Sequence, residues 1–460
     1  MIRNASFLAN CDALVFKGLC GTADAVLYPK PIHEIASQDP ESIAPAVFEV
    51  WLATGYFLQE KAFLSGPNPL NYVQAGRGRS QPSNFGGSVR VLVTADTFSG
   101  VWTYSRELVS GLVTHGAQVT LVSFGEIPLP HQTAWMDSLH GLEYIPTAFR
   151  LDWMQEGVQD FHAAQDYLCA IIRDTRPDFL HLNQLSFGAL PVATPRLVVA
   201  HGDVITWWLS IHGHEPAASA WLKWYRETMI AGLKRAETVV TTSRWMEEML
   251  RIAYGDGFEG HVIPPGRNPI YFNPFVTKEE SVLAIGRLWD TGKQVALLTQ
   301  HTHRLPVCIV GADNPIPAPA VPIRADVRVS TGEHEISVKG AQTESQLRSL
   351  YSKSTIFAAT SQYEPTGLAS VEAAFSRCAL VANDTEVYRE LWGDAALYFE
   401  RNNADSLSEI LTQLNGDSEL ARLYGTRAYN RARERFTARR MVDDYMRLYR
   451  RLRGSKVSAA

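Results

Sequence analysis

The sequence is poor in cysteine: it has five, an odd number, and no two of them form a CxxC pair. This argues against a disulfide framework and against a zinc or redox site of the CxxC type, so we expect reduced, mostly buried thiols in a cytosolic protein. No apolar run approaches the roughly eighteen residues that a membrane-spanning helix needs. Residues 1–20 interrupt their apolar stretch with polar side chains and contain no small-residue cleavage site, which argues against a signal peptide.

An excess of positive charge is also missing, and so are several common motifs. The formal net charge is −5, so no basic field favours nucleic acid, and we expect none as a partner. Neither HExxH nor GxSxG occurs, and no GxGxxG follows an early strand, which argues against zinc hydrolases, serine hydrolases and dinucleotide dehydrogenases. The segment Gly286–Lys293 only imitates a P-loop, because its glycines are one residue too far apart and Gln294 replaces the required Ser or Thr.

What the sequence does contain is the pattern of two doubly wound α/β domains. Its 460 residues, 46% hydrophobic and 20% charged, have the size and composition of two globular domains. Residues 90–96 and 117–124 are predicted strands on either side of a helix at 103–115, which gives a β-α-β unit with parallel strands. Further strands are expected at 179–183, 197–201, 238–242 and 261–264, then at 281–286, 306–311, 355–361, 378–384 and 395–400. Further helices are expected at 161–174, 219–236, 244–254, 420–435 and 439–453, and from the capping box at Thr343.

These patterns divide the chain into three parts. Residues 1–84 are an N-terminal extension with one helical stretch at 44–60, and we find no chemistry in it. Residues 85–265 are expected to form a first Rossmann-like domain, and residues 266–438 a second. The sequence leaves the role of the extension and the oligomeric state open.

The stretch Tyr363–Glu372 is the strongest candidate for a ligand site. A predicted strand leads into a Pro-Gly turn and then into a helix, and seven residues separate Glu364 in the turn from Glu372 in the helix. The carboxyl end of a parallel strand and the N-terminus of the next helix form the usual ligand crevice of such sheets. Two carboxylates there are good acceptors for vicinal hydroxyls. Two solvated acids on an ordinary strand-turn-helix explain the spacing equally well.

Three further candidates follow predicted strands. Gly100 opens a helix, where the backbone can approach a phosphate or a sugar, although a plain turn explains it equally well. His201 ends a strand, with Trp207 shortly after it, and a purely structural histidine remains the alternative. Arg287 and Lys293 combine a bidentate fork with a point charge, which suits a diphosphate, although two solvated cations are the alternative.

The basic run near the C-terminus, within 438–456, is first of all the pattern of a solvated helix face. It also admits a weak peripheral contact with anionic lipid at the inner face of a membrane. No acidic pair with metal-ligand spacing stands out in the sequence, so no metal and no other cofactor is expected.

The sequence resembles the family 4 retaining glycosyltransferases of the GT-B fold, from about residue 89 to residue 453. The segments that carry this resemblance, in the family's order, are DTFSGVWTYSRELVSGLVTHG, VVAHGDV, VIPPGRN, AIGRLWDTGK and YEPTGLASVEAA. It implies two Rossmann-like domains that face each other across a cleft. It also implies that the final helix, 439–453, crosses back to complete the first domain. The sequence departs from the family pattern at Ser99-Gly100, where paired glycines are usual, and at Thr366, where Phe is common.

The resemblance also implies roles for individual residues. Arg287 and Lys293 would hold the diphosphate of a nucleotide sugar and stabilise its departure, and Glu372 would bind the ribose hydroxyls. The other implied positions are Glu364 beside the transferred sugar, the Gly367 and Leu368 amides near sugar hydroxyls, Gly100 at the leaving phosphate, and His201 near the sugar and acceptor. The expected catalytic residues are His201, Glu364, Arg287 and Lys293. On the acceptor side we expect Trp102, Tyr104 and Trp207.

The expected function is therefore the metal-independent transfer of a sugar, with retention, from a UDP- or GDP-linked donor to a hydroxyl acceptor. The acceptor class stays open among glycans, lipid-linked molecules and small molecules. A phosphorylase or epimerase of the same fold and a non-catalytic sugar-nucleotide-binding subunit remain alternatives.

Overall fold

The computed structural model describes residues 88–97, 100–154, 157–287, 290–311, 328–330 and 335–457. The expected extension at 1–84, with its helix at 44–60, lies outside the described residues, and so does Ser99. The two β-sheets described below belong to one compact unit of the chain.

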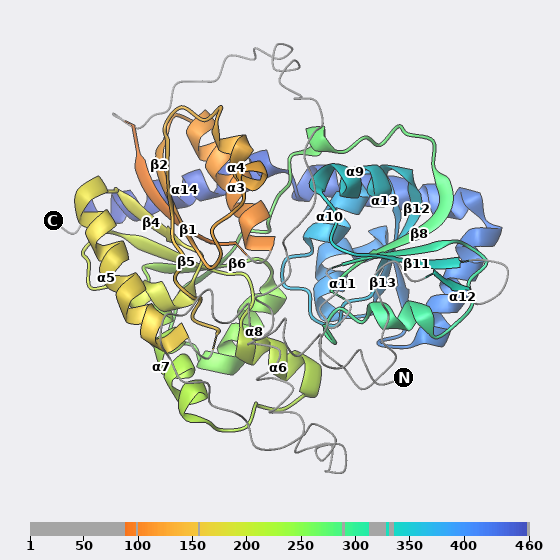
Figure 1. The fold of residues 1–460 in the computed structure, drawn as a ribbon, viewed down its shortest axis with the longest axis horizontal. Helices are drawn as coiled ribbons and strands as arrows, with labels where there is room; N and C mark the ends of the chain where they lie inside the picture. Colours follow the sequence, from red (N-terminus) through yellow and green to blue (C-terminus); the bar gives the residue numbers. More distant parts are fainter. Residues whose placement is uncertain are drawn as a thin grey trace, which may run out of the picture. The chain divides into compact units, whose positions relative to one another are not determined.

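The first sheet has seven parallel strands in the order β3-β2-β1-β4-β5-β6-β7 (Figure 1). They are β1 (Arg90–Asp96), β2 (Gln118–Phe124), β3 (Leu142–Pro146), β4 (Phe179–Leu182), β5 (Arg196–Ala200), β6 (Thr238–Thr241) and β7 (Gly260–Val262). The helices among them are α3 (Gly100–Thr114), α4 (Pro130–Thr133), α5 (Val158–Thr175), α6 (Val204–His212), α7 (Ala220–Arg235) and α8 (Arg244–Tyr254). The strand order reverses between β1 and β4, and open α/β sheets bind ligands at the carboxyl side of such a reversal.

The second sheet has the order β10-β11-β9-β8-β12-β13-β14, in which β10 is antiparallel and the other strands are parallel. Its strands are β8 (Glu279–Ile285), β9 (Val307–Val310), β10 (Arg328–Ser330), β11 (Glu335–Lys339), β12 (Ser354–Ala359), β13 (Ala379–Asn383) and β14 (Leu397–Phe399). The helices that follow are α9 (Glu344–Lys353), α10 (Leu368–Phe375), α11 (Glu386–Trp392), α12 (Ala404–Gly416), α13 (Ser418–Arg435) and α14 (Ala438–Val457). Short 3₁₀ turns are η3 (Ala134–Met136), η5 (Leu185–Ala189), η6 (Pro269–Tyr271), η7 (Val295–Thr299) and η8 (Gly393–Ala395).

The prediction of two doubly wound α/β sheets is confirmed, with three strands added. The sequence reading missed β3, β10 and β11. β3 reads LEYIP and β10 only three residues, RVS, and both lie at sheet edges. Edge strands are half solvated and short, so they lack the continuous apolar run by which a buried parallel strand is recognised.

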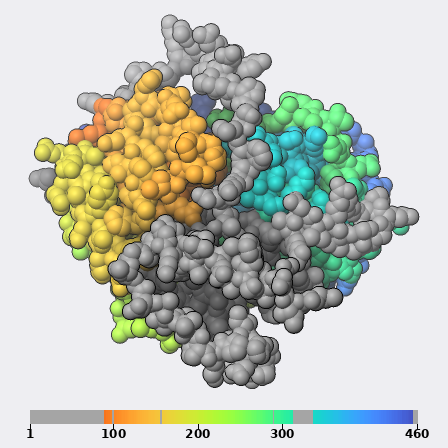
Figure 2. All heavy atoms as spheres, in the orientation of Figure 1, coloured from red at the N-terminus to blue at the C-terminus, as the bar shows by residue number. Residues whose placement is uncertain are grey.

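Each sheet is buried between helices. In the first sheet, Val91 and Val93 of β1 share a core with Leu108 of α3 and with Tyr445 and Tyr449 of α14. Helix α14 is the last described element, yet it packs on this sheet after the chain has passed through the second one (Figure 1). In the space-filling view of Figure 2, orange and yellow residues of the first sheet's part of the chain lie on the left and cyan residues of the second sheet's part lie on the right. Among the described residues no helix is long and apolar enough to span a bilayer.

Two chain segments connect the sheets, and they are bonded to each other. The first runs from β7 to β8 through Arg267, and the second joins α13 to α14 through Thr437. The Arg267 amide donates to the Phe436 carbonyl at 2.9 Å, and the Ala438 amide donates to the Arg267 carbonyl at 2.9 Å. Position 266 requires glycine, because an added Cβ would collide with the backbone of Thr437.

Candidate active site

The turn between β12 and α10 holds the Glu364 carboxylate against the backbone. Gly367, the N-cap of α10, has a left-handed φ of +65°, and its amide donates to Glu364 Oε1 at 3.0 Å. A Cβ at Gly367 would lie only 2.8 Å from Leu391 Cδ1. Glycine is therefore favoured at position 367 for two reasons: its backbone is left-handed, and a Cβ there would crowd Leu391. Glu364 is only 8% exposed.

The Lys293 ammonium is the counter-charge of this buried carboxylate. Its Nζ lies 2.7 Å from Glu364 Oε2. The loop that carries Lys293 is fixed to the residues before Glu364: Thr360 Oγ1 donates to the Lys293 carbonyl at 2.7 Å, and the Gln362 amide donates to the Gly292 carbonyl at 2.8 Å. Burial by itself raises the pKa of Glu364, but the charge and hydrogen bond of Lys293 outweigh it, so this pKa is lowered.

Arg287 lies after β8 and is ordered by Asp290. Its Nη2 is 2.7 Å from Asp290 Oδ2, while Asp290 Oδ1 accepts from the Gly292 amide at 2.9 Å. The Arg287 side chain is 43% exposed and that of Asp290 only 3%. Asp290 thus ties both ends of the loop together and presents the guanidinium of Arg287 at the surface.

On the first sheet, His201 follows β5, and its ring is held by Asn183 at the end of β4. His201 Nε2 lies 2.8 Å from Asn183 Oδ1. Because the Asn183 amide nitrogen donates to the Thr94 carbonyl at 2.6 Å, its oxygen faces the histidine, so Nε2 of His201 carries the proton. Burial lowers the pKa of His201 to about 3. The imidazole is therefore neutral at neutral pH.

The turn after His201 contacts the turn that carries Glu364. Gly202 has a φ of +116°, and an added Cβ would lie 2.7 Å from Tyr363 Oη and 3.0 Å from Pro365 Cγ. The Tyr363 hydroxyl also lies 2.9 Å from Thr206 Oγ1 and accepts from the Asp203 amide at 3.2 Å. Two strand ends from different sheets, one with His201 and one with Glu364, thus meet at these contacts.

Gly100 and Leu368 bring two helix N-termini together. Gly100 is the first residue of α3 and Leu368 the first residue of α10. A Cβ at Gly100 would lie 3.3 Å from Leu368 Cδ1, so the two residues are neighbours. An α-helix begins with amides that have no partner inside the helix and with the positive end of the helix dipole, which together suit an anion.

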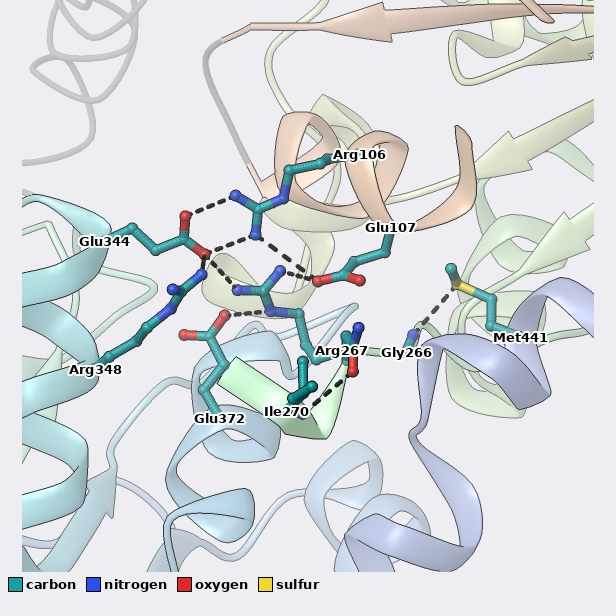
Figure 3. Close-up of polar contacts among 10 residues, drawn as sticks. Arg106, Glu107, Gly266, Arg267, Ile270, Glu344, Arg348, Glu372 and Met441 are labelled. Carbon is teal, nitrogen blue, oxygen red and sulfur yellow. Dashed lines mark hydrogen bonds and ion pairs between the residues drawn. The ribbon is translucent and has the colours of Figure 1, made fainter. Parts of the chain in front are cut away.

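Glu372 lies in α10, two turns after Glu364, and meets a buried arginine. Its Oε1 is 2.7 Å from Arg267 Nε, and the side chain of Arg267 is 1% exposed (Figure 3). The sequence reading assigned Glu372 without this partner, because nothing in the spacing of VIPPGRN indicates where Arg267 points.

Two of the three residues expected on the acceptor side pack within the first sheet. Tyr104 is 1% exposed, and its hydroxyl lies 3.1 Å from His181 Nε2. Trp102 packs edge-on against Trp135 and Tyr144, with ring centroids 6.3 and 6.2 Å away. In this structure both side chains have packing partners, and their contact with an acceptor stays a prediction.

The third, Trp207 of α6, lies against the loop of Lys293. A Cβ at Gly292 would lie 2.9 Å from Trp207 Nε1 and 3.4 Å from Ile211 Cδ1. Helix α6 is also tied to the second sheet, because Gln362 Nε2 donates to the Ser210 carbonyl at 2.8 Å. The structure therefore places Trp207 beside the loop predicted to bind the donor.

Sequence reasoning missed four residues that shape this site: Asp290, Tyr363, Asn183 and Arg267. Only Asp290 carried a usable signal, since an Asp two residues before a Gly is typical of a side-chain-stabilised turn. The others act through residues far away in the chain. In the described part of the chain, no group of three or more His, Cys, Asp or Glu side chains has the arrangement of a metal site.

Comparisons with known proteins agree on one family. Residues 99–266 match the model of the glycosyl transferase 4-like domain, and residues 274–431 match that of the glycosyl transferases group 1. The alpha-maltose-1-phosphate synthase of Mycolicibacterium smegmatis is 24% identical over 304 residues, which are 59% of this chain and 76% of that protein.

Solved structures show the same fold. Sucrose-phosphate synthase from Thermosynechococcus elongatus superposes with a TM-score of 0.63 and 18% identity, covering 80% of this chain and 100% of that one. Anabaena Alr3699/HepE in complex with UDP-glucose gives a TM-score of 0.57 and 13% identity, covering 78% and 98%.

Proposed function

The chain belongs to the family 4 glycosyltransferases of the GT-B fold, enzymes that use nucleotide-sugar donors, and we propose that it transfers a sugar with retention from a UDP- or GDP-linked donor to a hydroxyl acceptor. We further propose residues 266–438 as the donor domain. Residues 85–265 with helix 439–453 would form the acceptor domain. The observation that carries the proposal is the Lys293–Glu364 pair beside the helix starts of Gly100 and Leu368.

The donor's charged half matches the cationic groups of this site. The diphosphate would be held by Lys293 and Arg287 and by the helix N-termini at Gly100 and Leu368. Glu364 would accept from hydroxyls of the transferred sugar, with the Gly367 amide beside it. Glu372 would accept from the ribose hydroxyls, since a carboxylate can serve two vicinal donors.

The chemistry follows from where charge develops. Breaking the bond between the anomeric carbon and the phosphate oxygen leaves positive character on the sugar and negative charge on the diphosphate. Lys293, Arg287 and the two helix N-termini would stabilise the negative charge, and the proposed mechanism uses no metal ion. On the front-face route that we propose, the departing phosphate oxygen takes the proton of the acceptor hydroxyl, so no side chain has to act as a base.

His201 fits a binding role in this scheme. Its neutral ring has Nε2 committed to Asn183, and its Nδ1 is buried without a hydrogen-bond partner in the structure. A neutral imidazole can accept a hydroxyl hydrogen bond from the sugar or the acceptor at Nδ1. Trp207, beside the loop of Lys293, offers an aromatic face for a sugar ring.

The acceptor is a glycan, a lipid-linked molecule or a small molecule, and we propose a cytoplasmic enzyme. The exposed basic residues towards the end of α14, including Arg447, Arg450 and Arg451, would allow weak contact with an anionic membrane surface.

A thermal-shift screen against UDP-, GDP- and ADP-sugars tests the donor assignment. A ligand at about 100 times its Kd adds roughly 2.7 kcal/mol of stability, so a true donor should raise Tm clearly above the matching free sugar. NMR of the product made with that donor should show the donor's anomeric configuration. Lack of stabilisation by every nucleotide sugar, or an inverted product, would overturn the proposal; phosphorolysis without transfer would point to a phosphorylase.

A further inference from the structure

Arg267 is the hub of a buried charge network that joins helices of both sheets. Its side chain is 1% exposed and pairs with three carboxylates: Glu107 of α3 at 2.5 Å, Glu344 of α9 at 3.0 Å and Glu372 of α10 at 2.7 Å (Figure 3). Each carboxylate meets a different nitrogen of the guanidinium, Nη1, Nη2 and Nε respectively. Nη1 and Nη2 make hydrogen bonds with Glu107 and Glu344, whereas the contact of Nε with Glu372 is an ion pair without a hydrogen bond.

The position of this guanidinium is fixed on every side. The backbone of Arg267 is bonded to Phe436 and Ala438 in the paired connecting segments. Its guanidinium carbon lies 5.5 Å from the centre of the Phe272 ring. A side chain held at its backbone, face and edges has little freedom, so whatever it binds inherits that rigidity.

The other two arginines of the network, Arg106 and Arg348, pair with Glu344. Arg106 makes two bonds of 2.6 Å with Glu344, and Arg348 makes one of 2.7 Å with the same carboxylate. Among the described residues, Arg267 is the cation with which Glu372 forms an ion pair. Figure 3 shows Arg106 and Arg348 directed at Glu344 and the Nε edge of Arg267 directed at Glu372.

A second neighbour of Glu372 is the buried Tyr351. Burial and then the negative charge of Glu372 raise the pKa of Tyr351 well above its usual value. The phenol of Tyr351 therefore stays protonated, so it can donate a hydrogen bond to Glu372 but carries no charge. Arg267 is thus the charged partner of the Glu372 carboxylate, and the Tyr351 phenol is its neutral hydrogen-bonding neighbour.

We propose that Arg267 is a positioning residue for nucleotide recognition: by engaging Oε1 of Glu372 it directs the carboxylate at the ribose 2′- and 3′-hydroxyls. This inference rests on the proposed function, in which Glu372 binds the ribose. It adds that the site selects ribonucleotides over 2′-deoxyribonucleotides through a residue that does not touch the nucleotide. If the Glu372 carboxylate could rotate freely, it would bind a ribose with one hydroxyl nearly as well as a ribose with two. The preference for ribonucleotides over 2′-deoxyribonucleotides would then be lost.

Calorimetric affinities for UDP and 2′-deoxy-UDP, and for GDP and 2′-deoxy-GDP, test this directly. The wild type should bind the ribonucleotide of its preferred base at least about tenfold more tightly than the deoxy form, and Glu372→Gln should bring that ratio close to one. Arg267→Met should lower the ratio at least threefold, and Arg267→Lys should restore part of it. Arg106→Met is the matched control: it removes a cation from the same network without touching Glu372, and its ratio should equal that of the wild type.

Removing Arg267 also leaves the buried Glu107 without its closest partner, so the single variant can lose stability. The double variant Arg267→Met/Glu107→Gln removes that penalty and provides the same measurement, with Glu107→Gln as its reference. A ratio unchanged from the reference would overturn the inference, and so would an equal loss in Arg106→Met. If wild type binds none of these nucleotides, the proposed function itself fails. If it binds them with a ratio that Glu372→Gln leaves intact, Glu372 does not read the ribose and the inference falls with that assignment.

Discussion

Lys293 Nζ lies 2.7 Å from Oε2 of Glu364, so the cation expected to bind the diphosphate is paired with the carboxylate expected to bind the sugar. Both side chains are largely buried, at 23% and 11% exposure. On the proposed assignment, an incoming donor would exchange this ion pair for its own contacts: phosphate oxygens would replace the carboxylate at Lys293, and sugar hydroxyls would replace the ammonium at Glu364. Without a donor, the pair leaves each group charge-compensated.

Replacing Lys293 with Met should reduce both stability and turnover. Glu364 would lose its counter-charge, so burial would raise its pKa, and we expect a cost of about 1–3 kcal/mol in the free energy of unfolding. Loss of a cation at the leaving diphosphate should lower kcat by a factor of about 100 or more. Urea unfolding and initial rates measure the two effects. Adding Glu364→Gln should recover stability and leave turnover low; recovery of turnover in the double variant would contradict the assigned roles.

Replacing Arg287 with Met should lower turnover and also cost some stability. The Arg287 side chain is 43% exposed, but its partner Asp290 is only 3% exposed and would lose its counter-charge, so we expect a loss of about 1–3 kcal/mol in the free energy of unfolding. We expect kcat to fall by a factor of about 100, with a smaller change in donor KM. Arg389→Met is the control, because Arg389 is similarly exposed and pairs with Asp384 at 2.6 Å. Similar losses of activity in both variants would argue against a specific role for Arg287.

Gly202→Ala should disrupt the contact between the two strand ends. The new methyl group would meet Tyr363 Oη at 2.7 Å in addition to the cost of a positive φ. Gly213→Ala isolates the second cost, because Gly213 has a φ of +73° and nothing within 4 Å of an added Cβ. We expect a loss of about 1 kcal/mol for Gly213→Ala and at least about 2 kcal/mol more for Gly202→Ala. Equal losses in chemical denaturation would show that the contact with Tyr363 gives way easily.

His181→Gln should make stability less dependent on pH. His181 lies between the hydroxyls of Tyr104 and Tyr449, 3.1 and 2.7 Å away, and burial lowers its pKa to about 3. Between the unfolded pKa of about 6.5 and this folded value only the unfolded chain binds the proton, so stability falls as pH falls through that window. The wild type should lose about 2 kcal/mol from this group by pH 5, whereas the variant loses none of it.

At pH 7.5 the same variant should be less stable than the wild type by about 1–2 kcal/mol, because one or both tyrosine bonds are lost. Urea titrations at pH 7.5 and pH 5 should therefore show the gap closing. A constant gap would mean that His181 is protonated in the folded protein.

Much of the fold could be predicted because its signals are local. The strands RVLVTAD and TIFAATS are apolar runs of strand length, and the helices between them carry caps such as Thr343, whose hydroxyl accepts from the Gln346 amide. The strands β3 and β10 escaped prediction because edge pairing depends on a neighbouring strand, not on their own pattern. The strand-turn-helix at Glu364 could likewise be predicted, since Glu364, Gly367 and Leu368 form one turn whose geometry is set within five residues.

The sequence by itself determined which groups are available: the alternation of strands and helices, a turn with two carboxylates, a loop with Arg287 and Lys293, and a histidine at a strand end. Only the tertiary structure decided which of these groups meet. Lys293 and Glu364 are 71 residues apart, and Arg267 pairs with Glu107 across 160 residues. Such partners are set by how the sheets and connecting segments pack, and a residue's neighbours in the chain carry almost no information about them. For Glu372 the consequence is direct: the family resemblance implied a ribose ligand, and the fold added a buried arginine, Arg267, as the ion-pair partner of the carboxylate.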